Sequence, residues 1–246
     1  AAAIVKKALS LPGVRLAGFH CHIGSQIFDV TPFADAAGIM MDFIAAVKKE
    51  TGFEAEELNL GGGLGVPYTE DDRTVDYAAA IGKIAENARA HAARAGVTLP
   101  RVILEPGRSL VAAAGITLYT VGSVKEIPGF RNYVSIDGGM PDNPRYALYQ
   151  STYTVLIANR AGAAKDYRAT VAGRCCESGD LIGEDLPLQK PARGDILAVL
   201  TTGAYNYSMA SNYNRLPRPP VILVKDGTAR VAVRRESFED LVRNDL

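Results

Sequence analysis

The sequence predicts an α/β fold whose first half is a parallel sheet with helices and whose second half is a mostly antiparallel β domain. Residues 12–108 alternate short apolar runs, typical of strands, with longer segments of helical period. After residue 108 the helical period is lost, and short stretches rich in Val, Ile, Thr and Tyr follow one another. This change of period predicts a domain boundary, giving domains 1–109 and 110–246.

The first domain is predicted to read strand, helix, strand, helix, strand after an amphipathic helix at residues 1–11. The first long helix should start with Thr31 as its N-cap and end at Gly52, and the second should end at Gly96, since glycine favours the residue after a helix. The predicted strands and long helices cover residues 14–23, 31–51, 57–60, 75–95 and 101–104.

The second domain shows the period of two that half-buried strands produce. Asp226-Gly227 between two such runs predicts a hairpin, and Ser237 is placed to cap a short terminal helix. The predicted strands cover residues 110–125, 133–136, 167–171, 196–200, 221–224 and 229–233.

Each strand of the first domain ends in an unusual cluster: residues 20–25, Gly61-Gly62-Gly63, and residues 105–108. Parallel strands joined by helices place their carboxyl ends on one side, which is where such folds hold their sites. The glycine run alone is equally compatible with a tight turn and with backbone amides arranged to bind an anion. His20 is expected to point to the opposite side from His22.

Composition excludes several function classes. The 246 residues carry 27 basic and 27 acidic side chains, which argues against nucleic acid or an anionic membrane as the main partner. There is no apolar run of about 18 residues, so no membrane span is expected. Three cysteines cannot form a paired disulfide framework, which fits a cytoplasmic location, and no Cys/His spacing predicts a zinc site.

The three clusters resemble the pyridoxal-phosphate decarboxylases of the alanine-racemase fold. The motifs that carry this resemblance are His22-Ile23-Gly24-Ser25, Gly61-Gly62-Gly63 and Glu105-Pro106-Gly107-Arg108. Within that family the chain most resembles the diaminopimelate decarboxylases, through Cys176-Glu177-Ser178-Gly179-Asp180, Gly203-Ala204-Tyr205, and Arg145 with Ala147-Leu148-Tyr149. Tyr146 stands where the family has proline. The resemblance implies the last three βα strands of a TIM-type barrel, followed by the β domain.

The resemblance also implies a pyridoxal 5'-phosphate site. His22 would lie on the face of the cofactor ring, Glu105 would meet the pyridine nitrogen, and Ser25 would meet the phosphate. The full set of implied cofactor-binding residues is His22, Ser25, Gly61, Gly62, Gly63, Glu105, Gly107, Arg108 and Tyr205.

Substrate contacts are implied in the same way. Cys176 would be the catalytic proton donor, reaching with Glu177 into the active site of the partner subunit of a homodimer, whereas Cys175 is a bystander. An Arg fork suits a carboxylate, and Glu177 suits an ammonium group. The residues implied to bind the amino-acid substrate are Arg108, Arg145, Tyr149, Glu177 and Tyr205.

The implied reaction is decarboxylation of meso-2,6-diaminopimelate to L-lysine and CO2. The alternatives are another substrate for the same cofactor (arginine, ornithine or carboxynorspermidine), a non-catalytic regulator on this scaffold, or an unrelated phosphate-binding α/β protein. No lysine here ends an apolar strand in a polar cluster, so the Schiff-base lysine is expected upstream of Ala1. We therefore expect these 246 residues alone to be inactive.

Overall fold

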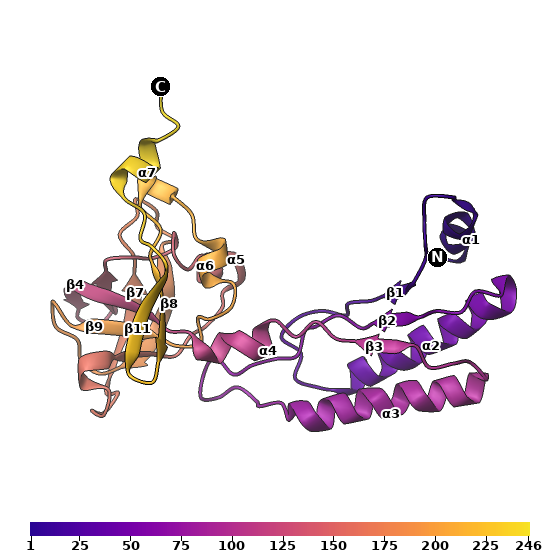
Figure 1. The fold of residues 1–246 in the computed structure, drawn as a ribbon. Coiled ribbons are helices and arrows are strands. Elements are labelled where there is room, and N and C mark those ends of the chain that lie inside the picture. Colours follow the sequence, from indigo (N-terminus) through magenta and orange to yellow (C-terminus); the bar gives the residue numbers. More distant parts are fainter. The chain divides into compact units, whose positions relative to one another are not determined.

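A parallel three-stranded sheet with two long helices forms the first of two compact units in the chain (Figure 1). The computed structural model describes residues 1–246, and this unit comprises Ala1–Val66 and Arg73–Leu110. Its elements are α1 (Ala2–Ser10), β1 (Gly18–His20), α2 (Thr31–Thr51), β2 (Glu57–Asn59), α3 (Tyr77–Ala95) and β3 (Arg101–Ile103). The strands lie in the order β1-β2-β3, all parallel, so the predicted α/β arrangement is confirmed.

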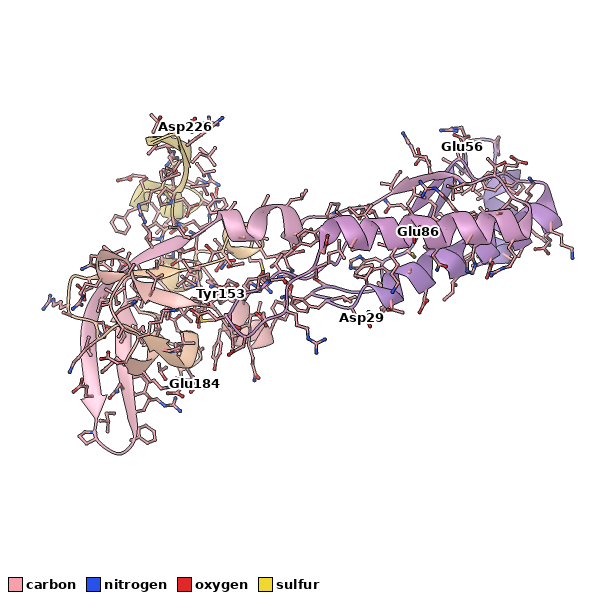
Figure 2. All side chains as sticks on the ribbon, turned by 90° about the horizontal axis from the view of Figure 1, so that it is seen from below. Asp29, Glu56, Glu86, Tyr153, Glu184 and Asp226 are labelled. Atoms are coloured by element: carbon pink, nitrogen blue, oxygen red, sulfur yellow. The ribbon has the colours of Figure 1, made fainter.

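Helices α2 and α3 pack against one another and against one face of this sheet. Met41 of α2, Ala88 of α3 and Leu58 of β2 are completely buried in their shared core. Alanines at the α3 contact positions allow the helices to approach closely. The opposite side of α3 faces solvent and carries Glu86 (Figure 2). One face of the sheet is thus covered by helices, and the strand ends are held in a fixed order.

Both long helices end as predicted. Gly52 and Gly96 follow α2 and α3 with φ of 74° and 63°, in the left-handed region that glycine adopts at little cost. The predicted start of α2 is wrong by one residue, because Thr31 is already helical and its N–H donates to the Asp29 carboxylate at 2.9 Å. No helix in the structure is long and apolar enough to cross a bilayer.

Strands of the first unit are shorter than their apolar runs suggest. The run at residues 14–23 contributes only Gly18–His20 to the sheet, and the residues from Cys21 onward leave it as a loop. A run of apolar residues indicates burial, whereas a strand also needs a hydrogen-bonded neighbouring strand. The predicted run is therefore longer than the observed strand. The residues released from β1 are those of the first predicted cluster.

The second unit, Pro67–Asp72 and Val111–Leu246, is built on a six-stranded sheet. Its strands are β4 (Thr117–Ile127), β5 (Arg131–Ile136), β6 (Val155–Ile157), β7 (Tyr167–Ala172), β8 (Leu181–Leu188) and β9 (Ile196–Val199), with a separate β10 (Val221–Lys225) and β11 (Thr228–Val233). The six lie in the order β6-β9-β4-β5-β7-β8, and every pair is antiparallel except β5 with β7. The prediction of a mostly antiparallel β domain is confirmed.

Several details of the second half differ from the sequence-based expectation. The start of the run predicted as extended, residues 110–125, is helical: α4 (Arg108–Val111) is followed by a 3-10 turn, Ala112–Ala114. Strand β6 and strand β8 are not predicted from the sequence. Strand β8 contains Gly183 and Pro187, residues that are depleted in strands, and its pairing with β7 is interrupted by register shifts.

The C-terminal predictions are confirmed. Asp226 and Gly227 have φ of 51° and 72°, the left-handed pair that a tight hairpin turn requires between β10 and β11. Helix α7 (Phe238–Val242) begins after Ser237, whose hydroxyl accepts a hydrogen bond from the Asp240 N–H at 3.3 Å. The Asp240 carboxylate accepts in turn from the Ser237 N–H, so each residue caps the other.

A buried glutamine links the two edge strands of the six-stranded sheet. Gln189, directly after β8, accepts a hydrogen bond from the Ile157 N–H of β6 at 2.8 Å. Its amide group donates to the carbonyl oxygens of Ala161 and Ala163 at 3.3 and 3.2 Å. One side chain therefore satisfies three backbone groups where the sheet nearly closes on itself.

Replacing Gln189 by leucine should destabilise the protein, because the buried Ile157 N–H would lose its acceptor. We expect the free energy of unfolding in urea to fall by about 1–3 kcal/mol. The neighbouring change Lys190→Ala removes an exposed ion pair with Glu126 at 3.2 Å and a contact of the ammonium group with the Tyr167 ring at 5.7 Å, and should lower the free energy of unfolding by about 1 kcal/mol or less. Equal losses for the two variants would contradict the proposed closure by Gln189.

Candidate functional site

Three loops that follow β1, β2 and β3 meet at the carboxyl end of the parallel sheet. The backbone of Gly61 to Gly63 lies between the other two loops and is hydrogen-bonded to both. Glu105 N–H donates to Gly61 O at 2.8 Å on one side, and Ile27 N–H donates to Gly63 O at 3.0 Å on the other. The three clusters that the sequence places at equivalent strand ends are therefore adjacent in space.

The glycines are required by this close approach. A Cβ on Gly62 would lie 2.1 Å from the Glu105 carbonyl oxygen, and one on Gly63 would lie 2.0 Å from the Gly24 carbonyl oxygen. Gly63 also has φ of 113°, which side chains rarely allow. The N–H groups of Gly62 and Gly63 have no acceptor within the chain. The run is thus a tight turn that also leaves two amides available to an anion.

Arg108 and Ser25 extend this group of donors. The Arg108 guanidinium donates to Ser25 Oγ at 3.1 Å, joining the third strand-end loop to the first. Arg108 is buried although it carries a charge, whereas Ser25 is exposed. A buried cation beside a hydroxyl and two amides without acceptors is a combination suited to a phosphate group.

Glu105 lies just past β3 with two polar neighbours from the other strands. The Asn59 side-chain amide donates to Glu105 Oε1 at 2.7 Å, and His20 Nε2 lies 3.8 Å from Glu105 Oε2. The expectation that His20 points away from the site is wrong, because His20 is paired with Asn59 across the sheet and its side chain shares that face, toward Glu105. Asn59 was not singled out from the sequence, although it stands two residues before the glycine run. His22 is exposed beside Gly61.

In the second unit, Arg145 lies between two tyrosine rings. Its guanidinium carbon is 5.4 Å from the ring centre of Tyr149 and 5.3 Å from that of Tyr205. Arg145 is buried and both tyrosines are exposed, so each ring lies within cation–π distance of a guanidinium that solvent scarcely reaches. Arg145 opens the short helix α5 (Arg145–Tyr149), and the hydroxyl of Tyr146 in the same helix donates to Glu184 at 3.0 Å.

The Cys176 loop is held by an aspartate whose role the sequence reasoning missed. Buried Asp180 accepts hydrogen bonds from the Met140 N–H at 2.6 Å and the Cys175 N–H at 2.7 Å. Gly139 and Gly173 pack so closely on this carboxylate that a Cβ on either would lie 2.2 Å from it. The only signal in the sequence was that Asp180 closes the motif Cys176-Glu177-Ser178-Gly179-Asp180.

Cys176 and Glu177 are both presented at the surface by this loop. The Cys176 N–H donates to Asn214 Oδ1 at 2.9 Å, and Cys176 is exposed. The Gly179 N–H, which donates to Glu177, lowers the pKa of that carboxyl, and the Tyr213 hydroxyl contributes. Burial raises the pKa of Cys175 to about 11, which keeps this thiol protonated and poorly reactive. This supports the expectation that Cys175 is a bystander.

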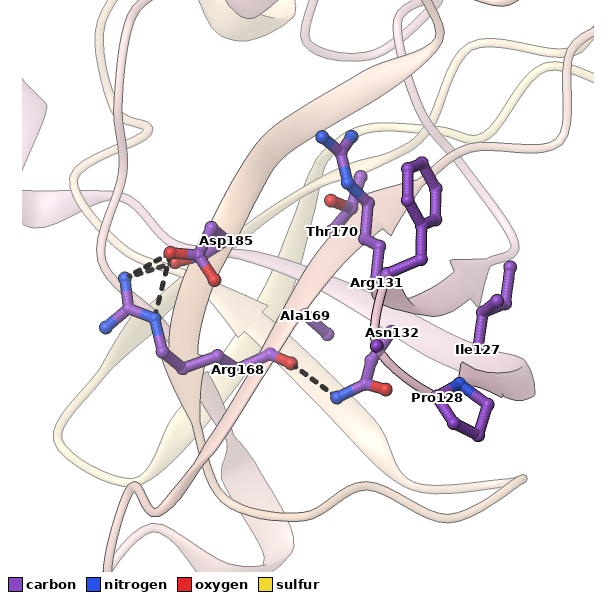
Figure 3. A pocket seen from close by; sticks show the side chains of 10 residues that line it. Ile127, Pro128, Arg131, Asn132, Arg168, Ala169, Thr170 and Asp185 are labelled. Carbon is purple, nitrogen blue, oxygen red and sulfur yellow. Dashed lines mark hydrogen bonds and ion pairs between the residues drawn. The ribbon is translucent and has the colours of Figure 1, made fainter.

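A surface pocket elsewhere in the second unit contains none of the predicted site residues. It has a volume of about 450 Å³ and lies at the turn between β4 and β5, against β7 and β8 (Figure 3). Its Arg168 pairs with Asp185 at 2.9 Å, and its Arg131 pairs with Glu184. Both cations are neutralised by neighbouring carboxylates, so the pocket offers no free charge to a ligand.

The predicted site residues therefore form three groups, each assembled within one unit. The first unit gathers His22, Ser25, Gly61, Gly62, Gly63, Glu105, Gly107 and Arg108, and the second gathers Arg145, Tyr149 and Tyr205, and separately Cys176 and Glu177. No cluster of His, Cys, Asp or Glu in the chain is arranged to hold a metal ion.

Comparison with known proteins gives consistent similarities across the chain. Residues 1–112 match the family described as pyridoxal-dependent decarboxylase, pyridoxal binding domain. Diaminopimelate decarboxylase of Bacillus subtilis is 49% identical over 242 residues, covering 98% of this chain and 55% of that protein. The chain thus spans about half the length of the curated relatives it matches.

Solved structures show the same similarity. The diaminopimelate decarboxylase of M. jannaschii in complex with L-lysine superimposes with a TM-score of 0.91 at 38% identity, over 99% of this chain and 55% of that one. The Helicobacter pylori enzyme complexed with L-lysine gives a TM-score of 0.86 at 29% identity, over 98% and 57% respectively. The fold of this chain is that of the corresponding half of these structures.

Gly62→Ala should strongly destabilise the first unit, because the added methyl group would overlap a backbone carbonyl oxygen. We expect the free energy of unfolding in urea to fall by about 3 kcal/mol or more. Gly82→Ala is the matched control, because Gly82 lies within α3 and a Cβ added there would meet no neighbouring atom. The free energy of unfolding of this variant should rise by about 0.5–1 kcal/mol. The same change in both variants would show that the glycine turn has room for a side chain.

Asp142, in the loop before α5, predicts a pH dependence of stability. Burial raises its pKa from 3.8 to about 6, so its contribution to stability is complete below pH 4 and is lost as the pH rises through 6. Asp142→Asn should therefore stabilise the protein at pH 8, by at most about 3 kcal/mol, and much less at pH 4. Urea unfolding of both proteins at the two pH values measures this; an equal difference at both would refute it.

Proposed function

We propose that this chain, which is similar to the diaminopimelate decarboxylases along 98% of its length, is the C-terminal portion of such an enzyme. The proposed reaction is the decarboxylation of meso-2,6-diaminopimelate to L-lysine and CO2. The observation that carries this proposal is the joining of three strand-end loops at Gly61 to Gly63, which assembles donors from all three predicted clusters. Similarity to diaminopimelate decarboxylases along 98% of the chain supports the substrate.

The first unit fits the phosphate of pyridoxal 5'-phosphate. Gly62 and Gly63 offer two N–H groups without acceptors, Ser25 offers a hydroxyl, and buried Arg108 supplies the compensating charge. Such a set binds a dianion with little reorganisation, because the backbone donors are already fixed by the neighbouring loops. We assign these residues, with Gly61 and Gly107 of the same loops, to the cofactor phosphate.

Glu105 and His22 are assigned to the cofactor ring. A carboxylate at the pyridine nitrogen favours its protonated form, and a flat imidazole suits contact with the ring face. When bound, the cofactor supplies an electron sink for the carbanion left by departing CO2. Both residues lie beside the glycine turn, on the same side of the first unit as the proposed phosphate ligands.

Arg145, Tyr149 and Tyr205 are assigned to the substrate carboxylate. The Arg145 guanidinium lies within 5.4 Å of both ring centres and donates from Nη2 to Ser151 Oγ at 3.4 Å, and the fork geometry of its N–H groups suits a carboxylate. The family resemblance also implies that Arg108 binds the substrate and that Tyr205 binds the cofactor.

Cys176 and Glu177 are assigned to the later part of the reaction. The Cys176 thiol would donate its proton to the substrate carbon from which CO2 has left, and Glu177 would hold the ammonium group at the distal centre. Both lie exposed on one loop, which suits side chains that reach into the partner subunit of a homodimer. The three free cysteines fit the proposed cytoplasmic location.

The complete protein should release CO2 from meso-diaminopimelate and form L-lysine in the presence of pyridoxal 5'-phosphate. Labelled CO2 release and chromatography of the amino-acid product measure this directly. Ornithine, arginine and carboxynorspermidine are the comparison substrates, and faster turnover of any of them would replace the proposed substrate. Cofactor binding without turnover of any of the four would favour a non-catalytic regulator.

A further inference from the structure

We propose that Asn59 is a positioning residue, which fixes the Glu105 carboxylate and ties it to the glycine turn. The Asn59 side chain makes two hydrogen bonds: its Oδ1 accepts from the Gly61 N–H at 2.8 Å, and its Nδ2 donates to Glu105 Oε1 at 2.7 Å. This inference deepens the proposed function and rests on it where it concerns the cofactor.

The strand register explains why these side chains meet. His20 of β1, Asn59 of β2 and Ile103 of β3 are paired across the sheet, so their side chains share one face. Glu105 follows Ile103 by two residues and lies on that same face. Leu58, the neighbour of Asn59, points the other way into the helix-covered core. The register of the parallel strands therefore places the Asn59 side chain next to Glu105.

The orientation of the Asn59 amide is determined by its two partners. The Gly61 N–H can only donate, so it requires the oxygen of the amide, and this leaves the NH2 group for the carboxylate. The reversed amide would bring its NH2 group against the Gly61 N–H and its oxygen against Glu105, losing both hydrogen bonds. The two hydrogen bonds therefore hold the side-chain amide of Asn59 in one orientation.

Glu105 depends on this contact because little else holds its side chain. The side chain is 56% exposed, and Asn59 donates the only hydrogen bond to its carboxylate, since His20 Nε2 at 3.8 Å is too distant. A half-exposed glutamate otherwise samples several rotamers. The Glu105 main chain is held through Gly61 as well, so Asn59 and Gly61 together set both its backbone and its side chain.

Two substitutions in the complete protein test this role. Asn59→Asp keeps an acceptor for the Gly61 N–H but turns a second oxygen toward Glu105, and Asn59→Ala removes both contacts. We expect the dissociation constant for pyridoxal 5'-phosphate to rise at least tenfold in Asn59→Asp and severalfold in Asn59→Ala. In crystals without cofactor, Glu105 should leave its position in Asn59→Asp and occupy several conformers in Asn59→Ala.

The matched control is Asn87→Ala in the same unit, which removes an asparagine hydrogen bond to the Ala34 carbonyl oxygen between α2 and α3. It should lower stability to urea and leave cofactor affinity and Glu105 unchanged. The proposal is overturned if Glu105 keeps its position in both Asn59 variants, whatever their affinity. If the parent protein itself binds no cofactor, the proposed function fails, and the position of Glu105 still decides the role of Asn59.

Discussion

The carbonyl oxygens of Gly24 and Glu105 press on the backbone of Gly62 and Gly63, and the candidate site depends on this contact. Three loops from three strands can meet only where the middle one has no side chains. The close packing uses the carbonyl oxygens of Gly61 and Gly63 as acceptors and leaves the N–H groups of Gly62 and Gly63 without partners. One steric condition therefore produces both the junction of the loops and the donors for an anion.

The second unit fixes the position of its loops by a different interaction. There a buried carboxylate, Asp180, gathers the backbone N–H groups of two loops, and Gly139 and Gly173 give it room. The exposed Cys176 is thereby attached to a rigid support, although its own side chain is at the surface. Arg145 is likewise buried and held by two exposed rings. In both units a group proposed to act on ligands is positioned by a neighbouring side chain, Glu105 by Asn59 and the Cys176 loop by Asp180.

Features governed by neighbouring residues could be predicted from the sequence, and those governed by distant contacts could not. The ends of α2 and α3 follow from Gly52 and Gly96, and the final hairpin follows from Asp226-Gly227, because each is set by local backbone preference. Strand β8 was missed because it contains Gly183 and Pro187, and only its pairing with β7 identifies it as a strand. The strand ends and their residue types pointed to the site, whereas the role of Asn59 depends on register across three strands.

The glycine turn also bears on how this region can change in evolution. The atom that a Gly62 side chain would meet is a main-chain carbonyl, which every amino acid carries, so no substitution at residue 105 relieves the overlap. Gly173 instead faces the side chain of Asp180, so a change at residue 180 could accommodate a larger residue there, whereas Gly139 also has φ of 147°, which side chains rarely adopt. Gly62 is therefore closed to substitution whatever residue stands at position 105, while Gly173 can change together with residue 180.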